Sequence, residues 1–97
     1  MTKIFQFTTF DWNKGNLDKN WKKHNVSNSE CEEVFFNEPL LISEDEKYSQ
    51  KEKRLQALGK TENNRLLFIS FTIRNNNIRI ISARNMSRKE KQHYEKA

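Results

Sequence analysis

Arginine side chains are concentrated in the last quarter of this 97-residue chain. Arg79 and Arg84 lie in the β-branched run 78–84, and Arg88 and Lys91 follow within two turns of a predicted helix. A guanidinium stays charged at any working pH and offers a planar set of donors that matches a phosphate. The spacing therefore predicts a rigid phosphodiester-binding surface.

Metal-free RNA cleavage needs one group that takes the 2′-hydroxyl proton, one that protonates the leaving 5′-oxygen, and fixed positive charge beside the phosphorane. Histidine is the usual proton carrier, and Lys, Tyr or Glu can replace it. The catalytic candidates are Lys23 and His24 for proton transfer, and Arg79 and Arg84 for charge stabilisation. The candidate RNA contacts are Arg54, Arg65, Arg88, Lys91 and Tyr94.

Each candidate also has an ordinary structural interpretation. His24 can cap a helix C-terminus. Arg79 can lie on the wet face of an amphipathic strand, and Arg84 can pair with an acid of the sheet or of a helix. The cations and the tyrosine of the terminal helix can be surface and packing residues. Trp12 and Trp21 are expected in the core rather than as base-stacking platforms.

The sequence lacks the motifs of several other kinds of site. Gly15 and Gly59 are the only glycines, which excludes a phosphate-binding loop. No HExxH motif is present, and a single cysteine permits neither an intramolecular disulfide nor a cysteine-based zinc site. Cys31 is expected to be a small buried residue rather than a nucleophile. We therefore expect no metal and no cofactor.

Length and charge indicate one small basic domain spanning residues 1–97. The net charge of +5 predicts attraction to anionic partners. Apolar residues make up only 34% of the chain, but seven Phe, two Trp and two Tyr supply large buried area. No window approaches the roughly 20 apolar residues of a membrane helix, and no signal peptide is evident. A cytoplasmic protein with no membrane segment is expected.

The N-terminal half is predicted to contain two helices. A short strand at 4–7 precedes a helix that starts after Asp11, with Leu17, Trp21 and His24 at the spacing of one helix face. Ser27 and Glu30 have the spacing of a capping box that starts the second helix, which ends before Pro39. The second helix carries an apolar stripe of Cys31, Val34 and Phe35.

The C-terminal half is predicted to be mostly strand. The candidate strands are 40–42, 54–58, 65–73 and 78–83. Residues 75–77 are three asparagines, which favour a tight turn. Ser87 and Glu90 form another capping-box pattern, which starts a helix that reaches Tyr94. We therefore predict an α+β fold: an antiparallel sheet of about four strands with two N-terminal helices and one C-terminal helix packed on it.

Over roughly residues 10–95, the chain resembles the BrnT toxin family. The N-terminal part of the resemblance is Phe10-Asp11-Trp12, Lys14, Asn20, Lys23-His24-Asn25-Val26-Ser27, Val34-Phe35 and Pro39. The C-terminal part is Gly59, Arg65-Leu66-Leu67, the run 78–84, Glu90-Lys91 and Tyr94-Glu95. Asn25 stands where the family usually has glycine, and asparagine tolerates the left-handed conformation.

The resemblance implies a type II toxin with a RelE-like α+β fold that cleaves RNA and arrests translation. It also implies a BrnA-like antitoxin whose N-terminal portion engages the toxin and whose ribbon-helix-helix domain binds operator DNA, so that the toxin reaches DNA only through its antitoxin. The residues matched as functional are Lys23, His24, Arg65, Arg79, Arg84 and Tyr94. His93 lies at a position that the family leaves variable, so it is discounted as catalytic.

Two other functions stay open from the sequence. The absence of a compelling acid–base pair is compatible with a non-catalytic basic module that binds RNA or an antitoxin-like partner. A DNA-binding regulator is less favoured, because the second helix is acidic at Glu30, Glu32 and Glu33 and would repel a phosphate backbone. Incubation with RNA in the presence of a chelator separates cleavage from binding.

Overall fold

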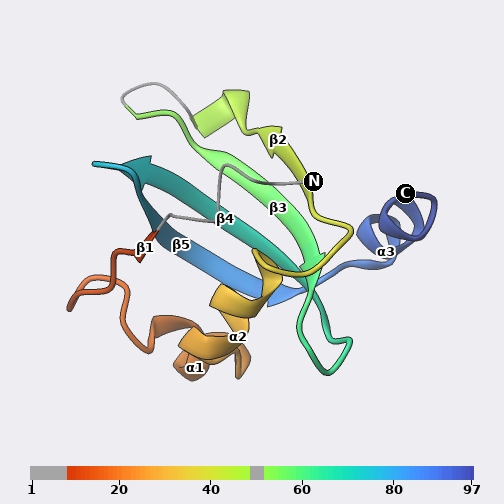
Figure 1. Cartoon of the computed structure of the whole chain (residues 1–97), viewed down its shortest axis with the longest axis horizontal. Helices are drawn as coiled ribbons and strands as arrows, with labels where there is room; N and C mark the ends of the chain where they lie inside the picture. Colours follow the sequence, from red (N-terminus) through yellow and green to blue (C-terminus); the bar gives the residue numbers. More distant parts are fainter. Residues whose placement is uncertain (1–8, 49–51) are drawn as a thin grey trace.

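The computed structural model describes residues 9–48 and 52–97, which form one five-stranded sheet with three α-helices (Figure 1). In chain order the elements are β1 (Thr9–Phe10), α1 (Lys19–His24), α2 (Asn28–Val34), β2 (Leu41–Glu44), the 3-10 turn η2 (Glu46–Tyr48), β3 (Leu55–Lys60), β4 (Leu66–Arg74), β5 (Asn77–Asn85) and α3 (Arg88–Glu95). The strands are ordered β1-β5-β4-β3-β2. The predicted α+β fold is confirmed.

Four of the five strands are antiparallel neighbours, as the sequence predicted. The turn between β4 and β5 is made by Asn75 and Asn76, whose φ angles of 51° and 66° are of the kind that asparagine tolerates. The fifth strand, β1, adds two residues in parallel to β5, so the sheet is mixed. The strand expected at 4–7 lies outside the described residues.

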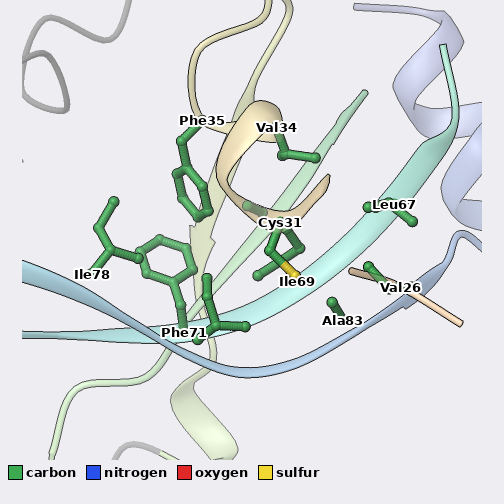
Figure 2. Packing of buried hydrophobic residues seen from close by; sticks show 11 residues of the cluster. Val26, Cys31, Val34, Phe35, Leu67, Ile69, Phe71, Ile78 and Ala83 are labelled. Carbon is green, nitrogen blue, oxygen red and sulfur yellow. The ribbon is translucent and has the colours of Figure 1, made fainter. Parts of the chain in front are cut away.

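The core lies between α2 and one face of the sheet. The predicted capping box is present: Ser27 Oγ accepts from Glu30 N at 3.1 Å, and the Glu30 carboxylate accepts from Ser27 N at 3.0 Å. Figure 2 shows the side chains of α2 and its C-cap above those of the sheet, including Cys31, Val34, Phe35, Leu67, Ile69 and Phe71. The prediction of a packing role for Cys31 is confirmed, because its side chain is fully buried.

The predicted start of the first helix is wrong. The helix begins at Lys19, after Asp18, and residues 14–18 form a turn. The expected apolar face is also wrong: Leu17 and Trp21 are 49% and 54% exposed, whereas Asn20 is buried. The expectation that Trp21 is a core residue therefore fails, while Trp12 does pack against the core.

The buried side of residues 16–20 is polar because it bonds to the backbone of β5. β1 pairs with only two residues of β5, and these side chains bond to the edge of β5 beyond them. The bonds run from Asn16 Nδ2 to Ile80 O (3.1 Å), from Lys19 Nζ to Ile81 O (3.3 Å) and from Ala83 N to Asn20 Oδ1 (2.9 Å). Ile81 is the extra residue of a bulge in β5. An edge strand needs partners for its backbone groups, and these side chains supply them.

The terminal helix α3 is fixed at both ends. The predicted capping box at Ser87 and Glu90 is present. Near the other end, the Tyr94 hydroxyl donates to Pro39 O at 2.6 Å, which anchors α3 to the loop before β2, and burial raises the pKa of this tyrosine. None of the helices in the described ranges is long and apolar enough to cross a membrane.

Candidate RNA-binding face

The sheet face opposite α2, called here the second face, carries aligned rows of side chains. Residues directly opposite one another in antiparallel strands point to the same side of the sheet. One row runs across the strands through Leu41, Leu58, Phe68 and Arg84. The next row is Ser43, Gln56, Ser70 and Ser82. Strands distant in the sequence thus place apolar, hydroxyl, amide and guanidinium groups on one surface.

A hollow of about 230 Å³ lies between this face and α3. Its lining comprises Leu41, Ile42, Ser43, Gln56, Leu58, Phe68, Glu90 and His93. Glu90 and His93 are three residues apart on α3 and so lie on one side of the helix. His93 was discounted as a catalytic residue from the sequence. The sequence feature that bears on its position is the capping box of Ser87 and Glu90, which starts α3.

Arg84 is held at the rim of the hollow. Its guanidinium carbon lies 4.2 Å from the centre of the Phe68 ring, and its Nη1 and Nη2 donate to the two oxygens of Glu90 at 2.8 and 3.0 Å. These bonds lower the pKa of Glu90 although burial opposes the shift. Nη1 also donates to Asn85 O, so within the described residues Nε and one Nη2 hydrogen are free to bind a ligand. The arginine is a fixed cation with spare donors.

Arg79 lies on the same face as Arg84 but at the other end of β5. The two arginines oppose Thr72 and Phe68, which are four residues apart on β4. Five residues along a strand correspond to roughly 16 Å. Arg79 Nη1 lies 3.6 Å from the Asp11 carboxylate, and within the described residues this buried nitrogen has no hydrogen-bond partner.

The turn that holds Arg79 depends on a small residue. Arg79 Nη2 donates to Asn13 Oδ1 at 3.2 Å. A Cβ atom on Gly15 would lie 3.0 Å from the same nitrogen. Gly15 therefore allows the close approach of the arginine.

Lys23 and His24 are exposed at the C-terminal end of α1. Arg65 fixes this end by donating to His24 O at 3.3 Å and to Asn25 O at 2.8 Å, and Asn25 adopts the predicted left-handed conformation with φ 55°. Arg65 also donates to Asn85 Oδ1 at 2.9 Å. Because Asn85 follows Arg84 in the chain, the lysine–histidine pair is at the Arg84 end of β5. Asn85 is opposite the core residue Leu67, so this contact is on the α2 side of the sheet, whereas Arg84 is on the second face.

Arg65 also forms an ion pair with Glu30. Arg65 Nη1 lies 3.1 Å from both Glu30 carboxylate oxygens. Burial raises the pKa of Glu30, but the bonds from Ser27 and Arg65 outweigh it, so the net shift is downward.

The other candidate RNA contacts lie farther out. Arg54 is partly buried just before β3. The last two cations, both exposed on α3, are Arg88 and Lys91.

The second face thus holds two arginines, of which Arg84 is fixed beside a hollow whose lining includes His93. Among the residues described, no three His, Cys, Asp or Glu side chains are grouped so that they could hold a metal ion.

A comparison with curated proteins finds no match. Residues 12–90 match the family described as ribonuclease toxin, BrnT, of type II toxin-antitoxin system. The match spans most of the chain, which therefore belongs to the BrnT family of ribonuclease toxins.

Proposed function

We propose that this protein is a metal-independent endoribonuclease whose second face binds and cleaves RNA. The observation that carries the proposal is the Arg84 guanidinium held over Phe68 at the rim of the hollow. In the reaction, the 2′-oxygen attacks the adjacent phosphorus and loses its proton to a base. The bond from phosphorus to the 5′-oxygen breaks, and an acid protonates that oxygen. The products are a 2′,3′-cyclic phosphate and a 5′-hydroxyl.

The roles are proposed from the end of β5 at which each residue lies. Arg84 stabilises the charge of the phosphorane, since preorganised donors act where negative charge develops. His24 or Lys23, at the same end of β5, transfers protons. Arg79, held by Asp11 and Asn13, is proposed to bind a second phosphate of an RNA strand that follows β5. The peripheral RNA contacts proposed are Arg54, Arg65, Arg88 and Lys91. Tyr94, also a candidate contact from the sequence, is buried and bonded to Pro39 O, so its proposed role is to position α3.

Cleavage of a labelled RNA in excess chelator tests the proposal. The native protein is expected to cleave, and Arg84→Ala to reduce the rate about a hundredfold or more, as for loss of one transition-state donor. Arg74→Ala is the matched control, because Arg74 also forms a bidentate ion pair with a carboxylate, that of Glu52. Equal rates for Arg84→Ala and the control would refute the role of Arg84.

The biological consequence proposed is arrest of translation, relieved by a partner. Induction of the chain alone should stop growth and degrade cellular RNA. The proposed partner is a BrnA-like antitoxin with a ribbon-helix-helix domain. Through this domain the toxin–antitoxin complex binds operator DNA and represses its own promoter. The proposed location of the toxin is the cytoplasm. Operator binding by the toxin alone, in a salt-dependent gel shift, would contradict this arrangement.

A non-catalytic binding module is the second candidate. Its support is that several arginines already have carboxylate partners within the chain: Arg65 with Glu30, Arg74 with Glu52, Arg79 with Asp11 and Arg84 with Glu90. Such pairs can serve to shape a surface rather than to stabilise a reaction. RNA binding without cleavage between about pH 5 and 9 would favour the module, since that range brackets the titration of an ordinary histidine.

A further inference from the structure

The hollow on the second face combines an apolar floor with polar groups that form no hydrogen bond within the part of the chain that the structure describes. Leu41, Leu58 and Phe68 lie opposite one another in register and form the floor. Gln56 and Ser43, also opposite each other, line the hollow beside that floor. Across residues 9–48 and 52–97, neither the Gln56 amide nor the Ser43 hydroxyl takes part in a hydrogen bond between side chains or to the backbone. These groups are available to a ligand.

The size and chemistry of the hollow fit one nucleobase. Its volume of about 230 Å³ is below the roughly 300–1,000 Å³ of sites for drug-sized ligands. A base has apolar faces that pack on side chains and a polar edge that forms hydrogen bonds. The Gln56 amide offers one acceptor and two donors, which is the combination that pairs with a base edge at two points.

The charges around the hollow fit a base that is still attached to its phosphate. Arg84 lies at the rim over Phe68, with donors left for a phosphate oxygen. Glu90 lines the hollow and would repel a phosphate if it were unpaired, but Arg84 and the N–H of Ser87 occupy its carboxylate oxygens. His93 adds a further polar group on the α3 side. A base in the hollow thus has its phosphate beside the arginine.

We propose that the hollow holds one base of the RNA chain and sets the base preference at the cleavage site. This inference rests on the proposed ribonuclease function and identifies the part of the substrate that this face recognises. Gln56 and Ser43 read the edge of the base, while the apolar floor packs on its face. A protein side chain from the antitoxin is the competing occupant.

The test is a cleavage map on four single-stranded oligoribonucleotides that differ at one base. The native protein should prefer one of the four, and Gln56→Ala should reduce that preference roughly tenfold, the loss expected for a two-point base contact. Ser43→Phe, which adds bulk from an exposed edge position, should slow cleavage of all four by at least tenfold. Gln92→Ala is the matched control, because Gln92 is exposed on α3 and does not line the hollow.

The outcomes separate this inference from the ribonuclease proposal. If the native protein cleaves RNA and Gln56→Ala keeps the pattern of Gln92→Ala, the base site is wrong and the ribonuclease stands. If the native protein cleaves no RNA, the ribonuclease proposal fails, and binding of the four ribonucleoside monophosphates then decides the base site. A shift of the Gln56 side-chain amide resonance by one of them supports it. No shift with any of the four, or a shift with an antitoxin peptide alone, overturns it.

Discussion

Replacement of Arg65 by alanine should destabilise the fold rather than only weaken RNA binding. Arg65 donates five hydrogen bonds, to His24 O, Asn25 O, Asn85 Oδ1 and both oxygens of Glu30. Hydrogen bonds to charged groups contribute about 1.5–3 kcal/mol each, but the Arg65 and Glu30 side chains are 27% exposed, so solvent screens the pair. We therefore expect a total loss of about 2–3 kcal/mol, or roughly 10–20 °C in Tm for a domain of this size.

Thermal unfolding followed by circular dichroism measures this loss. Arg65→Lys should recover little of it, because an ammonium lacks the planar set of donors. Arg88→Ala is the control: Arg88 is exposed, and its loss should change stability by no more than about 0.5 kcal/mol while weakening RNA binding. If Arg65→Ala melts within a few degrees of the native protein, its hydrogen bonds contribute little to stability and the structural reasoning is refuted, whatever the effect on RNA binding.

Three further predictions concern buried or paired groups. Asn20→Ala leaves the Ala83 N–H without its acceptor and should cost about 1–3 kcal/mol in urea unfolding; a change below 0.5 kcal/mol would contradict that bond. Burial raises the pKa of Cys31 to about 12, so a thiol reagent should label it at neutral pH far more slowly in the native protein than in urea, and equal rates would show that the thiol is accessible. The pKa values of Glu30 and Glu90 are lowered from 4.5 by folding, so their contribution is complete above the unfolded pKa and is lost as pH falls through the folded one. The free energy of unfolding should therefore drop below about pH 5, and less steeply in Glu90→Gln; an unchanged slope would argue against the pair.

Local signals predicted the elements of the fold well. The capping boxes at Ser27 and Ser87 and the asparagine turn at 75–77 all depend on neighbours within four residues, and all are present. The first helix failed because its environment is not local. The spacing of Leu17 and Trp21 predicted an apolar buried face, but the adjoining edge of β5 requires polar partners, which sequence periodicity does not reveal.

The candidate site was predictable only in part. The arginines of β5 could be found from their strand positions, and Arg84 proved to pair with an acid of the following helix, one of the interpretations left open. The hollow could not be found, because Gln56 and Ser43 come from two strands whose register is set by the whole sheet. His93 joins them only through the packing of α3, which Tyr94 fixes through Pro39.

The side-chain closure of the β5 edge also makes one amide a reporter of local opening. A strand amide bonded to another strand exchanges its hydrogen only when the sheet opens, whereas the Ala83 N–H is bonded to a side chain of α1. Its exchange requires only that α1 leave the sheet. Because α1 ends in Lys23 and His24, hydrogen exchange at Ala83 measures how often the helix that carries these two exposed side chains leaves the sheet.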